Sequence, residues 1–138
     1  MKSCLPPDAN PIKPMNKLPP GACDAHCHVF GPASKFPYAA DRSYTPPDAG
    51  FEELVRLHDF LGLSRGVIVQ ASCHGTDNTA MVDALQRGNG RYRGVAIVDG
   101  AVTDEQLADM NQQGVRGVRF NFVAHLGGAP DLDVFDRV

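Results

Sequence analysis

Residues 66–98, GVIVQASCHGTDNTAMVDALQRGNGRYRGVAIV, contain the pattern that decides the fold. Residues 66–71 and 94–98 are short apolar runs rich in β-branched side chains, which indicates two buried strands. Between them, residues 79–87 predict a helix that is closed by Gly88. Two buried strands joined by a helix form a βαβ unit, in which the strands are parallel and the crossover is right-handed.

The same alternation of strands and helices continues on both sides of this unit. Further strands are predicted at residues 22–29 and 115–120, and further helices at 51–61, 104 to about 113, and 132–138. Gly62 suits the C-terminal cap of the first helix, while Thr103 and Gln106 form a capping-box pattern before a later one. The order predicts an α/β fold, either an open doubly wound sheet or a TIM (β/α)8 barrel truncated to about its first four β/α units. No glycine-rich phosphate fingerprint follows the first strand, which argues against dinucleotide binding.

The composition predicts a soluble, globular chain with a proline-rich arm. Residues 1–20 form the arm, and residues 21–138 form the β/α domain. Of 138 residues, 43% are hydrophobic and 21% charged, and the net charge of −3 gives no basic face for nucleic acid. No run approaches the roughly 20 apolar residues of a membrane helix, and four scattered cysteines favour the reducing cytoplasm.

The first strand carries the most informative motif, Cys23–His28, with the sequence CDAHCH. Side chains alternate across a strand, so we expect Asp24, His26 and His28 on one face and the remaining three side chains on the other. Two imidazoles at the carboxyl end of a strand can converge on a divalent metal or on a substrate oxygen. A pair supplies only two ligands, whereas zinc needs three or four.

Two further polar side chains follow the later strands. Ser72 falls at the carboxyl edge of the second strand, where its hydroxyl either binds a ligand or caps the next helix. Arg119 ends the fourth strand and should point into the barrel mouth, because the alternate apolar residues face the helices. Its partner is predicted to be a ligand carboxylate or, alternatively, Asp24 or Asp99 in an internal salt bridge.

These blocks resemble a known family. GACDAHCHVFGP, the aromatic loop ending SYTPPD, QASCHGTDN and GVRGVRFNFV follow one another over about residues 18–128. The chain is similar to the amidohydrolase-related branch of the amidohydrolase superfamily, which includes 2-pyrone-4,6-dicarboxylate lactonases and sugar-lactone hydrolases. The resemblance implies a (β/α)8 barrel and a hydrolase that opens a lactone ring in a small carboxylated compound.

The resemblance also implies roles for individual residues. His26 and His28 match catalytic strand-one histidines, and Tyr44, Ser72 and Arg119 match residues that contact substrate, with Arg119 holding a carboxylate. His125 stands where the dicarboxylate lactonases carry a second arginine, and we expect it to reach the same site. This branch is thought to work without a metal, although zinc or manganese on His26 and His28 stays open.

The chain is expected to be incomplete as an enzyme. A (β/α)8 barrel needs about 250 residues, and the acidic general base that the resemblance places on the last strand has no counterpart here. The alternatives are a metal-dependent amidohydrolase or decarboxylase on the same fold, and an inactive fragment. Open barrel edges would favour self-association, and a small lactone or carboxylate is the expected partner.

Overall fold

The computed structural model describes residues 2–122 and 133–138, and its centre is a parallel sheet covered by helices. The sheet has the order β2-β4-β5-β6, and all three neighbouring pairs are parallel. Its strands are β2 (Cys23–Cys27), β4 (Arg65–Val69), β5 (Tyr92–Ile97) and β6 (Val115–Arg119). The helices are α1 (Phe51–Leu61), α2 (Thr79–Arg87), α3 (Asp104–Gln112) and the short α4 (Asp133–Arg137). The predicted alternation of strands and helices is therefore confirmed.

The helix ends follow the predicted capping signals. Gly62 closes α1 in the left-handed region at φ 79°, which favours glycine because it has no Cβ. At α3, the Thr103 hydroxyl accepts from the amide of Gln106 at 3.2 Å, and the Gln106 side chain accepts from the amide of Thr103 at 2.9 Å. Local sequence thus fixes where α1 ends and where α3 begins.

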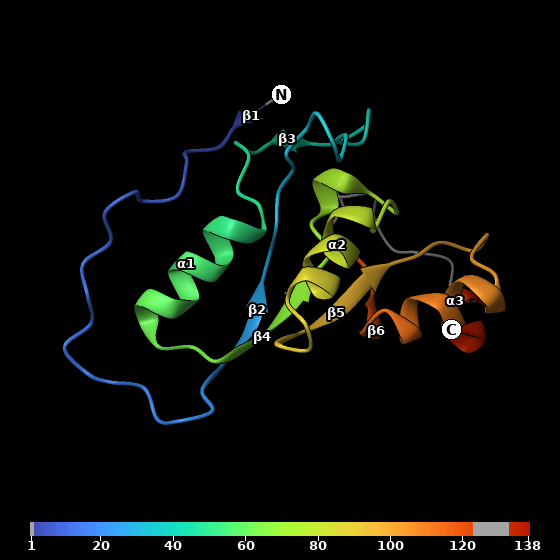
Figure 1. Ribbon diagram of the computed structural model, residues 1–138. Coiled ribbons are helices and arrows are strands. Elements are labelled where there is room, and N and C mark those ends of the chain that lie inside the picture. Colours follow the sequence, from blue (N-terminus) through green and yellow to red (C-terminus); the bar gives the residue numbers. More distant parts are fainter. Residues whose placement is uncertain (1, 123–132) are drawn as a thin grey trace.

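The core lies between the helices and the sheet; in Figure 1, α2 lies in front of the strands and α1 lies beside β2. Ile68 of β4, Met81 of α2 and Ala96 of β5 have no exposed surface. Helix α2 contacts both β4 and β5, and α3 contacts β6. Because the helices cover this face, polar side chains at the strand ends are left for the opposite face and the sheet edge.

The proline-rich arm makes a contact that the sequence did not predict. Strand β1 (Lys2–Ser3) pairs in parallel with β3 (Tyr44–Thr45), which lies in the long irregular segment before α1. Between β1 and β2 the arm follows a wide path past α1 (Figure 1). The arm therefore meets the same segment that carries Tyr44, while its independence as a separate region stays a prediction.

The first strand contains a bulge, and this corrects the predicted distribution of its side chains. Asp24 is paired with Gly66 and Cys27 with Ile68, so β2 advances by three residues while β4 advances by two. The extra residue breaks the strict alternation on which the prediction rested. The Asp24 side chain consequently contacts His58 of α1 on the helix side and does not share a face with the two strand-one histidines.

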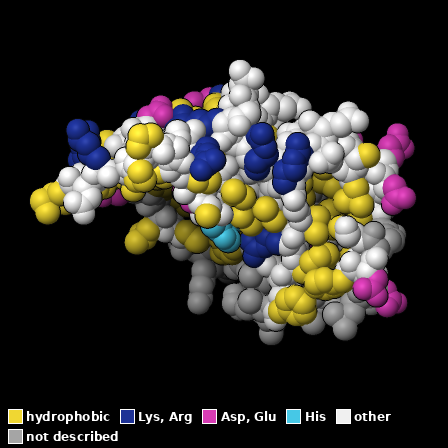
Figure 2. Space-filling model, turned by 90° about the horizontal axis from the view of Figure 1, so that it is seen from below, with side chains coloured by type: hydrophobic (Ala, Val, Ile, Leu, Met, Phe, Trp, Pro, Cys, Tyr) yellow, Lys and Arg dark blue, Asp and Glu magenta, His cyan; other side chains and the backbone are white. Residues whose placement is uncertain are grey.

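The surface retains apolar side chains in several places. Seen from below, hydrophobic side chains gather in a patch in which a histidine lies beside a basic side chain, and acidic side chains lie towards the edge (Figure 2). Among the large apolar side chains that are exposed, Leu5, Ile12 and Met15 belong to the arm and Phe122 follows β6. Within the described residues, no helix has the length and hydropathy that a membrane crossing needs.

Candidate active site

The two strand-one histidines lie side by side at the end of β2. Their ring centroids are 5.0 Å apart, with the planes at 81°. His26 is exposed and His28 is half-buried. The bulge in β2 moves Asp24 away from this pair but keeps the two imidazoles together, as the sequence predicted.

His28 is held by the neighbouring strand. Its Nδ1 lies 2.7 Å from the carbonyl oxygen of Val69, so Nδ1 carries the proton and donates it, which leaves Nε2 as an acceptor. Burial lowers the pKa of His28 below its usual 6.5, and the nearby His26 and Arg119 lower it further, against the opposing effect of the Val69 carbonyl. The imidazole is therefore neutral at neutral pH, with its free lone pair on Nε2.

Arg119 also reaches the end of β4, but it comes from β6, on the opposite side of β4 from His28. Its Nη1 donates to the carbonyl of Gln70 at 3.3 Å, and its Nη2 donates to Oδ1 of Asn121 at 2.5 Å. Neither Asp24 nor Asp99, both within the described residues, lies within ion-pair distance of the guanidinium, so the predicted internal salt bridge is wrong. Asp24 is occupied by His58, and Asp99 accepts from the amide of Ala101.

Ser72 and Tyr44 meet each other close to this strand end. Strand β4 ends at Val69, earlier than predicted, and Ser72 opens a 3-10 turn, η1 (Ser72–His74). The Ser72 hydroxyl donates to the Tyr44 hydroxyl at 3.4 Å. At the start of α2 the carboxylate of Asp77 accepts from the amide of Thr79 at 3.1 Å, so Asp77 does the capping that was an alternative for Ser72.

Contacts thus bring the described candidates to one strand end. His28 and Arg119 bind the adjacent carbonyl oxygens of Val69 and Gln70, and Ser72 follows two residues later in the chain. His26 contacts His28, and Tyr44 contacts Ser72. His125 lies outside the described residues.

Two buried polar residues shape the surrounding loops, and the sequence did not predict their roles. His74 is 3% exposed; it accepts from the amide of Gly31 at 3.3 Å and donates to the carbonyl of Pro37 at 3.2 Å. The Gln70 side chain donates to the carbonyl oxygens of Gly75 and Asp77. His74 therefore ties the loop after β2 to the loop after β4, and no local spacing in the sequence signals such a long-range contact.

The donor atoms at the candidate site do not by themselves complete a metal centre. His26 and His28 supply two imidazoles, whereas catalytic zinc takes three protein ligands. The guanidinium of Arg119, which lowers the pKa of His28, adds a positive charge that favours an anion over a cation. Any metal held here would need ligands beyond the described residues.

A second group of three residues has the right atom types for a metal, and it lies on the helix side of β2. Ligand atoms of Asp24, Cys27 and His58 lie within 4.8 Å of one another. Burial raises the pKa of Cys27 to about 12, with a further rise from Asp24, so the thiol keeps its proton at neutral pH. Because the thiolate is the form that binds metal, and both His58 ring nitrogens already have partners, this group fits a hydrogen-bonded cluster better than a metal centre.

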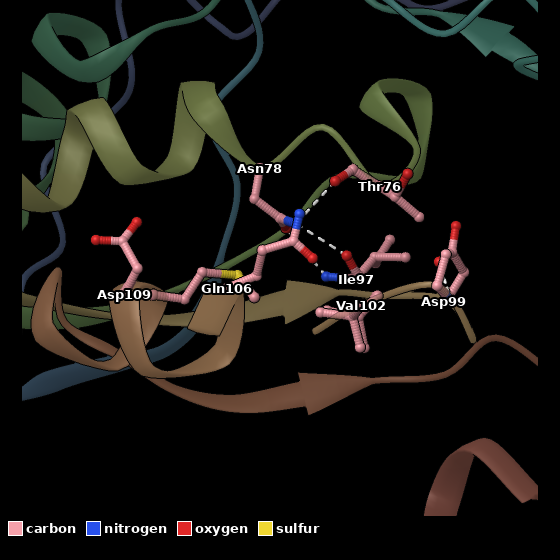
Figure 3. A pocket seen from close by; sticks show the side chains of 10 residues that line it. Thr76, Asn78, Ile97, Asp99, Val102, Gln106 and Asp109 are labelled. Carbon is pink, nitrogen blue, oxygen red and sulfur yellow. Dashed lines mark hydrogen bonds between the residues drawn. The ribbon is translucent and has the colours of Figure 1, made fainter. Parts of the chain in front are cut away.

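A hollow of about 400 Å³ lies elsewhere, between the end of β5 and the starts of α2 and α3 (Figure 3). Its walls include Asn78, Asp99 and Gln106, and none of the candidate site residues that the structure describes lines it. The Asn78 side chain forms part of the wall and makes hydrogen bonds to the backbone of Ile97. We therefore assign this hollow a structural role and keep the candidate site at the end of β4.

A parallel β/α sheet with polar side chains gathered at the carboxyl ends of its strands is the arrangement found in β/α-barrel enzymes. The amidohydrolase family model matches residues 23–138, and the chain belongs to this family.

Curated relatives with known names share much of this sequence. The chain is 57% identical over 118 residues to a 2-pyrone-4,6-dicarboxylate hydrolase of Comamonas testosteroni, a match that covers 86% of this chain and 39% of the relative. It is 45% identical over 138 residues to a 4-sulfomuconolactone hydrolase of Hydrogenophaga intermedia, covering 98% of this chain and 45% of the relative. The chain therefore spans less than half the length of the curated relatives it matches.

Solved structures give the same fold. The crystal structure of a probable 2-pyrone-4,6-dicarboxylic acid hydrolase from Acinetobacter baumannii, with citric acid bound, matches with a TM-score of 0.72 and 31% identity over 82% of this chain and 41% of that one. An apo structure from Agrobacterium tumefaciens matches with a TM-score of 0.69 at 24% identity, over 89% of this chain and 44% of that one, and shows the fold alone. The barrel, and not the open doubly wound sheet, is the architecture to which these β/α units belong.

Proposed function

We propose that this chain forms the carboxylate-anchoring part of a lactone hydrolase, with His26 and His28 next to the reacting carbonyl. The relatives named above are hydrolases of cyclic esters that carry acid groups. The observation that carries the proposal is the binding of His28 and Arg119 to adjacent carbonyls of β4. A neutral acceptor nitrogen and a permanent positive charge are thereby both fixed against the end of β4.

Arg119 would bind the substrate's acid group. Its guanidinium can present two parallel donors to a carboxylate, or to a sulfonate, and such charge-assisted pairs are strong and directional. In this chain Nη2 is bonded to the amide oxygen of Asn121, which orients the plane of the guanidinium. Gln70 and Asn121 are neutral acceptors and do not balance the charge of the guanidinium. A substrate carboxylate would supply the missing negative charge.

His28, His26 and Ser72 would act on the ester end of the substrate. With Nδ1 donating to Val69, His28 can present only Nε2 to a ligand. This nitrogen can accept a proton from the attacking water. Once protonated, it can donate a hydrogen bond to the developing oxyanion. Groups that transfer protons in this way accelerate related reactions by about 10²–10⁴-fold. The Ser72 and Tyr44 hydroxyls supply neutral donors and acceptors for the ring substituents.

The direct test is turnover by the full-length protein. Hydrolysis of 2-pyrone-4,6-dicarboxylate and of 4-sulfomuconolactone is followed by the loss of ring absorbance, for wild type and for His28→Ala. We expect hydrolysis of at least one lactone and a fall in kcat/KM of about 10² or more in the variant. Full activity of His28→Ala on the wild-type substrate would disprove the role of His28, and no lactone turnover would disprove the proposed reaction.

The metal question has its own measurement. We propose that no metal is required, because two imidazoles and a guanidinium favour an anion. Metal content, and activity after treatment with a chelator, test whether a metal is required. Stoichiometric zinc or manganese, with activity lost on chelation and restored by the metal, would favour the metal-dependent amidohydrolase or decarboxylase instead. Self-association through the outer strands β2 and β6 stays a prediction for size-exclusion chromatography.

A further inference from the structure

A chain of three hydrogen-bonded side chains lies beneath the first strand, on the side away from the candidate site. Tyr92 of β5 contacts His58 of α1, with the phenol oxygen 3.2 Å from Nδ1. The other ring nitrogen of His58, Nε2, lies 3.2 Å from Oδ2 of Asp24. Tyr92 and His58 are each only 1% exposed. Buried polar groups of this kind are costly unless they are satisfied, and both nitrogens of His58 are.

The chain of bonds has a definite direction. Burial raises the pKa of Tyr92, which keeps its hydroxyl protonated and available as a donor. When Tyr92 donates to Nδ1 of His58, the ring proton is on Nε2, and Nε2 donates to the Asp24 carboxylate. Asp24 is thus the acceptor at the end of the chain.

Asp24 links His58 to the backbone of β2, the strand that carries His26. Its second oxygen, Oδ1, accepts from the amide of His26 at 3.0 Å. The amide lies inside the bulge, between the pairs Asp24–Gly66 and Cys27–Ile68, where β2 has one residue more than β4. A carboxylate bound to the helix side therefore accepts a hydrogen bond from a backbone amide at the bulge, where the regular pairing with the neighbouring strand is interrupted.

The packing around His58 leaves the ring little freedom. A Cβ on Gly66 would lie 3.1 Å from Cε1 of His58 and 3.2 Å from two ring atoms of Tyr92. The ring centroids of His58 and Tyr92 are 5.6 Å apart. Glycine at position 66 thus allows the imidazole and the phenol to approach the sheet closely, and the ring is fixed by its packing as well as by its two bonds.

We propose that His58 and Tyr92 are positioning residues of the active site, acting through Asp24 to hold the bulge that aims His26 and His28. Loss of the bulge would shift the strand by one residue, and a shift of one residue turns each side chain to the opposite face. This proposal deepens the lactone-hydrolase proposal and rests on it for its kinetic readout. Neither residue touches the substrate.

The test uses three variants in the full-length protein. His58→Gln can keep a donor at the place of Nε2, His58→Asn keeps only a group at the place of Nδ1, and Tyr92→Phe removes one hydroxyl with the ring retained. Leu54→Ala is the control, because Leu54 is buried on the same face of α1, one turn before His58, and makes no bond to Asp24. Each protein is measured for kcat, KM, thermal stability and the amide proton shift of His26.

The expected result separates positioning from simple stabilisation. In His58→Asn the His26 amide resonance should move upfield and kcat should fall about tenfold to a hundredfold, as misplacement of catalytic groups by about 1 Å can cause. KM should stay within about twofold, because the Arg119 anchor is unchanged. His58→Gln should restore most of kcat, Tyr92→Phe should lie between the two, and Leu54→Ala should lose thermal stability without moving the His26 resonance.

Two results would overturn the proposal. One is an unchanged His26 amide shift in His58→Asn, which would show that Asp24 holds the bulge without His58. The other is an equal loss of kcat in His58→Gln, His58→Asn and Leu54→Ala, which would reduce His58 to a packing residue. If the wild-type enzyme hydrolyses no lactone, the proposed function fails, whereas the amide shift still decides whether the positioning chain exists.

Discussion

His28 and Arg119 bind adjacent carbonyl oxygens at the end of one strand, although they come from strands on opposite sides of it. His28 follows β2 and donates to Val69 at 2.7 Å, whereas Arg119 ends β6 and extends past β5 to reach Gln70 at 3.3 Å. The end of β4 is therefore the fixed point against which both side chains are set. A substrate that contacts both groups is oriented by backbone atoms, which move less than side chains.

Replacing Arg119 with lysine should weaken substrate binding strongly. Lysine keeps the positive charge but cannot present two parallel donors or bond Gln70 and Asn121 together. Hydrogen bonds to charged groups contribute about 1.5–3 kcal/mol, so we expect kcat/KM to fall about 10- to 100-fold. The measurement is steady-state kinetics of the full-length protein on a lactone dicarboxylate.

The matched control is Arg116→Lys in the same strand. Arg116 is exposed and donates to the backbone carbonyls of Asn111 and Val115. Its replacement should leave kcat/KM within about twofold, as is usual for surface substitutions. Equal effects of the two variants would show that Arg119 does not bind the substrate's acid group.

Ser72 and Tyr44 should act as a pair on substrate affinity. The hydroxyl contact of 3.4 Å is long, so it adds little stability by itself. We expect Ser72→Ala and Tyr44→Phe each to raise KM about fivefold, from the loss of one neutral hydrogen bond of about 1 kcal/mol. In a double-mutant cycle their effects should fall short of additivity, because they share a ligand site; strictly additive effects would place them at separate points.

The order of strands and helices was predictable because local sequence patterns determine it. The two β-branched runs at 66–71 and 94–98, and the capping box of Thr103 and Gln106, each act within a few residues. The pairing of β1 with β3 was not predictable, since it joins Lys2 to Tyr44 across an irregular segment without periodicity. The bulge in β2 was not predictable either. The sequence pattern assumes that side chains alternate strictly across a strand, and the extra residue of a bulge is defined only by the pairing with the neighbouring strand.

The candidate site was predictable in part. His28 and Arg119 both reach the end of β4 because the strands of the sheet are parallel, so that their carboxyl ends lie at one edge. The contacts of His58 and His74 could not be foreseen, because each depends on where a helix or a loop packs in three dimensions. The alternative of an internal salt bridge for Arg119 was wrong because the bulge turns Asp24 towards α1 and Asp99 binds the amide of Ala101.

The stability of the protein should fall as the pH drops below about 6.5, in part because of His74. Burial lowers the pKa of His74 below 6.5, against the opposing effect of the Pro37 carbonyl to which the ring donates. Between the lowered pKa and about 6.5 the unfolded chain binds more protons than the folded chain, so the free energy of unfolding rises with pH there. His28, whose pKa is also lowered by burial, contributes with the same sign.

Urea unfolding at several pH values between 5 and 8 measures this effect. One proton contributes a slope of at most about 1.4 kcal/mol per pH unit. His74→Gln removes the titrating ring and can still accept from Gly31, so its unfolding free energy should depend less steeply on pH than that of the wild type. Parallel pH profiles for the two proteins would show that protonation of His74 does not oppose folding.

Asn78 provides a case in which the general rule for helix starts and the structure give opposite predictions. Asn78 is the N-cap residue of α2, and aspartate is as good as asparagine at that position in general. Here, however, the side chain makes no cap bond; its amide donates to the carbonyls of Thr76 and Ile97 at 2.9 Å each, and its Oδ1 accepts from the Ile97 amide at 3.1 Å (Figure 3). Aspartate could keep only the last of these three bonds.

We therefore expect Asn78→Asp to destabilise the protein about as much as Asn78→Ala, because a carboxylate would face two carbonyl oxygens. Loss of the partners of a buried polar group costs about 1–3 kcal/mol, and the half-buried position of Asn78 beside a hollow of about 400 Å³ should keep the cost towards the lower end. Thermal unfolding of both variants is compared with Asn10→Asp, an exposed change in the arm that adds the same charge. If Asn78→Asp unfolds at the wild-type temperature, the capping rule prevails and the bond to β5 contributes little.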